Sequence, residues 1–413
     1  MSEYHVGSFT VGYEEYWRRS QSSLDKAIES HQIVLDTNAI LHLYRMNASA
    51  RGEYLNVLEK VANRIWIPRQ VADEFHRNRL SSVDVHIRAL REKSSAVMDA
   101  ANTLQSALRD FARLHSLAGG ASAYVAPFND SIGQIKRAVQ SNVDEFDLSP
   151  ERLISDDPIL RRIAVIFDSR VGAGVPPERR QEVEQEAERR GKEKIPPGYK
   201  DVAKKGEEGY GDYFIWQEIL DQAQATKKPI LFVSTDVKED WVRTQCGLTV
   251  GPRPELVEEM RRIAGVQYFH ITLASFLARA SGVLDVPVSQ ETIDQVKERS
   301  DAQRRLKKEL NELTLQLAEI SDQAVAVHRI AQEAEQREMM AVARLAAAEE
   351  ASSKFDRSTP EWAQHSTEVD YFMDARKEAA LRRHIAFEEL AQLENRRTVT
   401  QDMLKLLQVR LRA

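Results

Sequence analysis

Four acidic side chains in this sequence could meet at one edge of a sheet. Three of them lie beside short apolar runs and one lies in a helical segment: Asp36, Asp212, Asp236 and Glu74. Grouped carboxylates repel one another unless cations neutralise them, and their hard oxygen atoms suit Mg²⁺ or Mn²⁺. Such ions can activate a water molecule and stabilise a leaving phosphate oxygen. The pattern therefore predicts a Mg²⁺ or Mn²⁺ centre that hydrolyses phosphate esters.

Each of these acids, taken alone, also has a simpler structural explanation. Asp36 could begin a helix, Asp212 could favour a helix N-terminus, and Glu74 could face solvent. Asp236 with Glu239 three residues later fits a helix capping box. Four acids at separate strand ends and on facing helices nevertheless favour one shared site over four unrelated positions.

Other polar residues extend this candidate site. Glu74 shares a polar stripe with Gln70 and Asn78, because residues four apart lie on the same face of a helix. Asp240 and Asp201 are further candidate metal ligands, although a surface position is the simpler interpretation of each.

Basic and aromatic side chains near the acids could hold a phosphate backbone and stack on a base. Arg77 and Arg79 follow the helical acid, and Tyr199 and Lys200 lie in a lysine-rich loop. Acidic residues are mixed into this loop, so an ordinary solvated charged loop is an equally good interpretation.

Four short apolar runs predict the buried strands that would position these residues, at 33–35, 64–67, 229–233 and 266–271. Helices are expected at 13–30, 53–61, from Pro68 to about 117, and at 212–223, 237–243 and 272–280. Loops are expected at 118–130 and, with a short helix, at 170–201. Strands that alternate with helices predict an α/β domain with a mostly parallel sheet. Sites in such domains lie at the carboxyl ends of the strands.

The amino-acid composition of the chain changes at about residue 289. The segment 289–413 contains no glycine and one proline, Pro360, and is rich in alanine, glutamate and leucine. Apolar residues recur there in alternating steps of four and three, which predicts a coiled-coil helical hairpin. Apolar residues off this seam, such as Ile385 and Leu406, predict that the hairpin forms a homodimer or a higher oligomer.

Composition excludes several classes of protein. The 413 residues include 58 Lys+Arg and 64 Asp+Glu, so the net charge is −6 and any nucleic-acid contact requires a local basic surface. The single cysteine, Cys246, excludes a disulfide framework and a cysteine-based zinc site. The sequence has neither a long apolar run nor a signal peptide, so we expect a cytoplasmic protein with no membrane segment.

Four sequence motifs look like the acidic motifs of PIN-domain nucleases: IVLDTNAIL, WIPRQVADEF, YGDYFIW and FVSTDVKEDW. The longer stretches EFHRNR, IPPGYKD, STDVKEDW and GPRPELVEEM resemble one bacterial PIN-like family. The resemblance covers roughly 33–277 and implies a Rossmann-like three-layer fold with a helical insertion. It also implies metal-dependent phosphodiester cleavage, usually of RNA. It matches Asp36, Glu74, Asp212 and Asp236 to metal-site acids, and Asn38 and Thr235 to flanking substrate-binding positions.

The sequence therefore predicts a metal-dependent nuclease at 1–288, with a helical insertion at about 81–170 and a basic loop at about 170–205. RNA is favoured over DNA as the substrate, and the added hairpin at 289–413 suggests a toxin or phage-defence effector. One alternative is a DNA-directed nuclease with the same site. A second is a catalytically silent coiled-coil interaction protein, against which the four acids argue. A phosphohydrolase with an aspartate nucleophile would favour a second aspartate where Asn38 stands.

Overall fold

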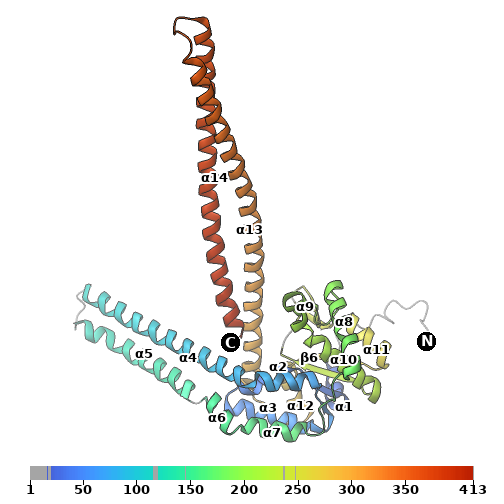
Figure 1. The fold of residues 1–413 in the computed structure, drawn as a ribbon. Coiled ribbons are helices and arrows are strands. Elements are labelled where there is room, and N and C mark those ends of the chain that lie inside the picture. Colours follow the sequence, from blue (N-terminus) through green and yellow to red (C-terminus); the bar gives the residue numbers. More distant parts are fainter. Residues whose placement is uncertain are drawn as a thin grey trace. The chain divides into compact units, whose positions relative to one another are not determined.

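The computed structural model describes residues 16, 20–114, 120–144, 146–235, 238–246 and 248–412 (Figure 1). The chain forms two compact units, the first extending to Asp301 and the second comprising Ala302–Arg412. In the part of the chain that the structure describes, none of the helices combines the length and the apolar character of a membrane-spanning segment.

A four-stranded parallel sheet forms the centre of the first unit, in the order β2-β1-β3-β6. The strands are β1 (Gln32–Leu35), β2 (Ile65–Trp66), β3 (Ile230–Ser234) and β6 (Tyr268–Thr272). Every residue of β1 and β3 is buried, as expected for parallel strands covered on both faces. The predicted α/β class and the four predicted strands are confirmed.

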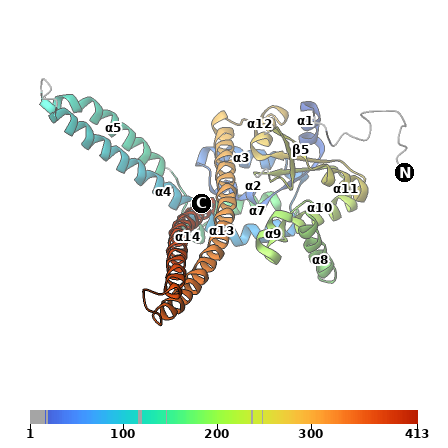
Figure 2. The ribbon, with the colours of Figure 1, turned by 90° about the horizontal axis from the view of Figure 1, so that it is seen from above.

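Two groups of helices cover this sheet (Figure 2). One group contains α1 (Gln21–Ser30), α3 (Ala48–Lys60) and α12 (Leu273–Val283). The other contains the start of α4 (Arg69–Leu114), α10 (Gly211–Thr226) and α11 (Pro254–Ala264). Short helices connect these elements: α2 (Thr37–Leu41), η2 (His42–Tyr44) and η3 (Ala62–Arg64). The result is the three-layer arrangement that the resemblance implied.

The insertion of the first unit is a helical hairpin made of α4 and α5 (Gly120–Asp144), followed by α6 (Pro150–Ser155) and α7 (Pro158–Phe167). The loop predicted at 118–130 is wrong from Gly120 onward, because α5 begins there and contains Pro127. Proline removes one helical hydrogen bond, but the packing of α5 along α4 compensates for this loss. Residues 115–119 lie outside the described residues.

Two other local predictions also differ from the structure. The segment 170–201, predicted as a loop with a short helix, contains the 17-residue α8 (Pro177–Glu193), whose charged residues pair at helical spacing, as Arg180 and Glu184 do. The helix predicted at 237–243 is wrong. The Lys238 carbonyl accepts hydrogen bonds from Trp241 and Val242, which makes only a turn. An antiparallel pair follows, β4 (Val242–Gln245) and β5 (Leu248–Pro252).

The second unit is a helical hairpin formed by α14 (Pro360–Arg412) and the part of α13 (Gln290–Ser352) that follows Asp301. Its core contains residues of the predicted seam: Ile320, Ala324, Val327 and Leu393. The predicted coiled-coil hairpin is confirmed. Ile385 and Leu406 are more than half exposed.

Candidate active site

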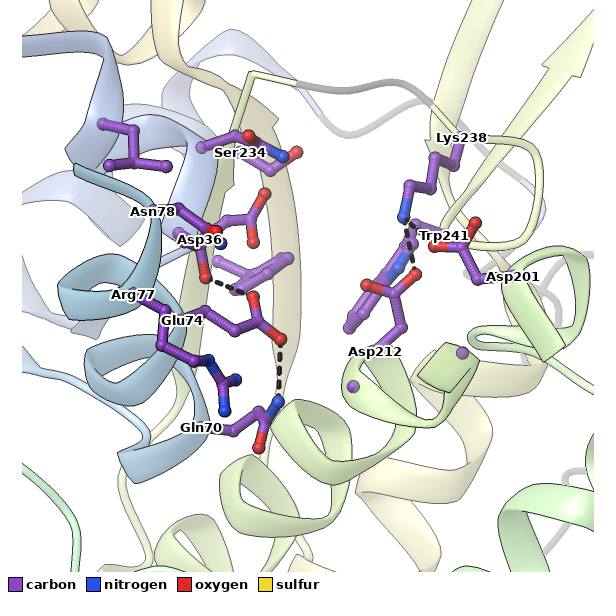
Figure 3. Close-up of a pocket in the computed structure, with 16 residues that line it drawn as sticks. Asp36, Gln70, Glu74, Arg77, Asn78, Asp201, Asp212, Ser234, Lys238 and Trp241 are labelled. Carbon is purple, nitrogen blue, oxygen red and sulfur yellow. Dashed lines mark hydrogen bonds and ion pairs between the residues drawn. The ribbon is translucent and has the colours of Figure 1, made fainter. Parts of the chain in front are cut away.

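A cavity of about 560 Å³ lies at the carboxyl ends of β1 and β3. Four carboxylates from separate elements line it (Figure 3). Asp36 follows β1, Glu74 belongs to α4, Asp201 belongs to α9 (Tyr199–Lys205), and Asp212 lies in the first turn of α10. The short helix η4 (Gly206–Gly209) connects α9 to α10. The fold therefore gathers acids that are up to 176 positions apart in the sequence numbering.

Asp36 is held in place by the backbone at the end of β1. Its amide donates to the Val233 carbonyl of the neighbouring strand, and its own carbonyl accepts from Ala39 and Ile40 at the start of α2. Although Asp36 occupies the N-cap position of α2, its side chain does not cap this helix. Simple helix capping therefore does not explain this acid.

Two neutral donors orient the Glu74 carboxylate. The Thr37 hydroxyl donates to Oε2 and the Gln70 side-chain amide donates to Oε1, both at 2.8 Å. Gly211 approaches so closely that a Cβ atom there would lie 2.7 Å from Oε1 of Glu74. Glu74 is thus fixed by contacts from α2, α4 and α10.

The opposite side of the cavity contains a shared ion pair (Figure 3). The Lys238 ammonium lies 2.7 Å from Asp212 Oδ2 and 2.9 Å from Asp201 Oδ2. The Trp241 ring lines the same side and stacks on Phe232, with 4.9 Å between the ring centroids. Lys238 lies inside the FVSTDVKEDW motif, but its position in the sequence predicts no role for it.

Asp240, a candidate metal ligand, lies behind the side of the cavity that Lys238 and Trp241 form, and it does not line the cavity. Its side chain is completely buried, and its Oδ2 accepts a hydrogen bond from the Gly198 amide at 3.1 Å. Burial, and secondarily the charge of Asp212, raises the pKa of the Asp240 carboxyl. Its contact with Gly198 shows that it holds the loop before α9 against the turn that carries Lys238.

The structure separates the predicted substrate-binding residues into two groups. Asn38 and Arg77 line the cavity. Arg79 does not, and instead pairs with the buried Asp157 at 2.6 Å. The remaining three also lie outside the cavity lining: Thr235, Tyr199 and Lys200. Lys200 and Tyr199 both contact Glu239, at 2.7 and 3.4 Å.

Asp236, the fourth predicted acid, lies outside the described residues. Ser234, two positions earlier at the end of β3, lines the cavity. The FVSTDVKEDW motif therefore contributes lining residues on both sides of the undescribed pair 236–237, namely Phe232, Ser234, Lys238 and Trp241.

The donor atoms in the cavity suit a hard divalent cation. They are carboxylate, hydroxyl and amide oxygens, and Mg²⁺ is commonly held by one or two carboxylates while it keeps several waters. Over the described part of the chain, no three His, Cys, Asp or Glu side chains are grouped as ligands of one ion.

Comparison with known proteins identifies one family. The family described as "PIN like domain" matches residues 32–256. This range begins in β1 and ends in α11, and it includes every residue that lines the cavity. No curated protein and no solved structure matches the chain.

Proposed function

The chain belongs to the PIN-like domain family, and on this basis we propose that it is a metal-dependent nuclease that hydrolyses phosphodiester bonds. One observation carries the proposal. Asp36, Glu74 and Asp212 come from three distant segments and line one cavity at the carboxyl ends of parallel strands. We propose Asp236, two positions after the last residue of β3 in the sequence, as the fourth acid of this site.

We propose different roles for the residues that line the cavity. Asp36 and Glu74 would hold Mg²⁺ or Mn²⁺, and the bound cation would supply an activated water and charge stabilisation at the phosphate. Thr37 and Gln70 fix the orientation of Glu74, so the ligand is positioned before any ion or substrate arrives. The Arg77 guanidinium lines the cavity and would bind a phosphate oxygen.

RNA is the substrate that we propose, and DNA is the alternative. Proteins distinguish the two through contacts to the 2′-hydroxyl group. Asn38 lines the cavity and has the amide donors and acceptor that such a contact requires. A role in defence or as a toxin, and assembly of copies through 289–413, are further proposals that rest on the added hairpin.

A direct assay tests the nuclease proposal. The full chain is incubated with labelled RNA or DNA in Mg²⁺, Mn²⁺ or EDTA, and we expect metal-dependent cleavage that EDTA abolishes. Asp36→Asn should remove cleavage and leave the fold at least as stable, because repulsion between carboxylates is relieved. Asp73→Asn, on α4 but paired with Arg69 outside the cavity, is the matched control and should cleave normally.

Two results would contradict the proposal. Cleavage by Asp36→Asn and Glu74→Gln at the wild-type rate would exclude the proposed site. A wild-type chain that binds the ions but cleaves neither RNA nor DNA would favour the alternative of a catalytically silent interaction protein.

A further inference from the structure

The acids of the cavity differ in what compensates their charge. Asp201 and Asp212 share a cation that the protein itself supplies, because the Lys238 ammonium lies within 2.9 Å of an oxygen of each. The two hydrogen bonds onto Glu74 come instead from the neutral groups of Thr37 and Gln70. The cavity thus has one side on which Lys238 lies within ion-pair distance of two acids, and another that holds Glu74, Asp36 and the Arg77 guanidinium (Figure 3).

Lys238 is held in position on its side of the cavity and does not extend freely into solvent. Its carbonyl accepts hydrogen bonds from the amides of Trp241 and Val242, at 3.0 and 2.9 Å, so the turn that carries it is closed. The Trp241 ring is stacked on Phe232 of β3. The exposed fraction of the Lys238 side chain is 25%, and this side chain therefore lies mostly inside the protein.

Its partners are equally well fixed. Asp212 lies in the first turn of α10 and is 16% exposed. A side chain on Gly209 would collide with the backbone of Asp201, so this part of η4 packs directly against α9. Two oxygens from different helices therefore converge on one ammonium position.

Asp240 adds to the negative charge of this side. It is completely buried next to this ion pair, and the charges of Asp212 and Lys238 both act on it. Without the ammonium, the paired oxygens of Asp201 and Asp212 would have no cation between them, and the buried Asp240 would add to the negative charge behind them. Carboxylates grouped in this way bind a divalent cation or repel one another.

We infer that Lys238 takes the place of a second metal ion, so that the cavity accepts one divalent cation, on the side of Asp36 and Glu74. Asp212 is then the partner of a lysine and not a direct metal ligand. This inference rests on the proposed function only in that the site takes a divalent cation. The resemblance to PIN-domain nucleases implied that Asp212 is a metal-site acid, and the inference differs from it on this point.

Counting bound ions tests the inference without any nucleic acid. Mn²⁺ is titrated into the full chain and followed by calorimetry and by electron paramagnetic resonance. We expect one ion per wild-type chain, two ions per chain in Lys238→Met, and one ion in Lys238→Arg, which keeps the positive charge. Lys200→Met is the matched control, because Lys200 pairs with the exposed Glu239 outside the cavity, and it should bind one ion.

A second pair of variants covers the case in which Lys238→Met does not fold. Asp36→Asn should raise the Kd for Mn²⁺ by about tenfold or more. Replacing a residue that only hydrogen-bonds to a metal ligand typically lowers metal affinity by about ten- to a hundredfold, and replacing the ligand itself should lower it at least as much. Asp212→Asn should change that Kd by less than about threefold. Unfolding temperatures in EDTA establish that each variant is folded.

The inference is overturned by two ions of similar affinity on the wild-type chain, or by one ion of unchanged affinity on a folded Lys238→Met. It is also overturned by a tenfold loss of affinity in Asp212→Asn, or by a wild-type chain that binds no ion. A chain that binds one ion and cleaves no nucleic acid would refute the proposed nuclease and leave the role of Lys238 intact.

Discussion

Replacement of Gly211 by alanine places a methyl group against the carboxylate of Glu74. The new Cβ would lie 2.7 Å from Oε1 of Glu74, whereas ordinary contact begins at 3.4 Å, so the two atoms must separate by about 0.7 Å. The Glu74 carboxylate cannot retreat freely, because Thr37 and Gln70 hold both of its oxygens at 2.8 Å. The substitution therefore strains those two hydrogen bonds or displaces the proposed ligand.

The expected effect on function is large and the expected effect on stability is small. A misplacement of about 1 Å in a catalytic site can cost a hundredfold in rate, so we expect Gly211→Ala to reduce cleavage by roughly ten- to a hundredfold. Gly211 is the first residue of α10, where alanine is a good helix former, so stability should change by less than about 1 kcal/mol. Mn²⁺ affinity should fall together with the cleavage rate.

Steady-state cleavage of a labelled RNA, Mn²⁺ titration and thermal unfolding measure these three quantities. Gly52→Ala is the matched control, because Gly52 lies in the interior of α3 and a Cβ there would meet nothing within 4 Å. We expect the control to cleave normally and to be slightly more stable. Normal cleavage and normal Mn²⁺ affinity in Gly211→Ala would refute the idea that the position of Glu74 matters.

Three further substitutions probe the structure around and beyond the site. Asp157→Ala should cost about 3–5 kcal/mol in urea unfolding, because it leaves the Arg79 guanidinium, 18% exposed, without its partner. Burial opposes the ionisation of Asp147, but the Arg51 guanidinium outweighs it and lowers the pKa of this carboxyl. Because this pKa lies below the unfolded value, the pair stabilises the protein at neutral pH and loses that contribution as the pH falls below about 4. Asp147→Asn should therefore be less stable than the wild type at pH 6, with the difference closing towards pH 2. Leu393→Asp should lower the temperature at which helical circular dichroism is lost, since it buries a charge in the core of the hairpin.

Each of these substitutions has a control and a contrary outcome. Asp156→Ala removes only an exposed ion pair with Arg161 and should lower the free energy of unfolding by at most about 1 kcal/mol. An equally small loss in Asp157→Ala would show that the buried pair of Asp157 with Arg79 does not stabilise the protein. A pH profile of Asp147→Asn parallel to that of the wild type would show that Asp147 contributes nothing through its charge. Leu381→Asp changes a residue that is 59% exposed, and a loss equal to that of Leu393→Asp would contradict the hairpin core.

The strands were predictable because of how they are buried. Parallel strands covered on both faces appear in the sequence as continuous apolar runs, as Ile33–Leu35 and Leu231–Val233 do. The β4–β5 pair was missed because β4 has the sequence VRTQ, which contains no apolar run and is partly exposed. Its position follows from tertiary contacts of β5 with β6, which no local pattern reveals.

The candidate site was predictable in part for similar reasons. Asp36 follows a strand, and this local signal places it at the edge of the sheet. The different positions of Arg77 and Arg79 also follow from helix geometry, because residues two apart point to nearly opposite faces. The role of Lys238 was not predictable, because it depends on two acids that lie 26 and 37 residues away in sequence.

The 46-residue helix α4 joins two parts of the first unit mechanically. At 1.5 Å per residue it is about 70 Å long, and its first three turns carry Gln70, Glu74, Arg77 and Asn78 while its remainder forms the hairpin with α5. The residues that line the cavity and the residues that pack on α5 therefore belong to one continuous helix, so a change in the direction of the hairpin would also shift the turn that carries Glu74. The Arg69 and Gln70 amides donate to the buried Glu218 carboxylate at 2.6 and 3.0 Å and so fix the first turn of α4 to α10.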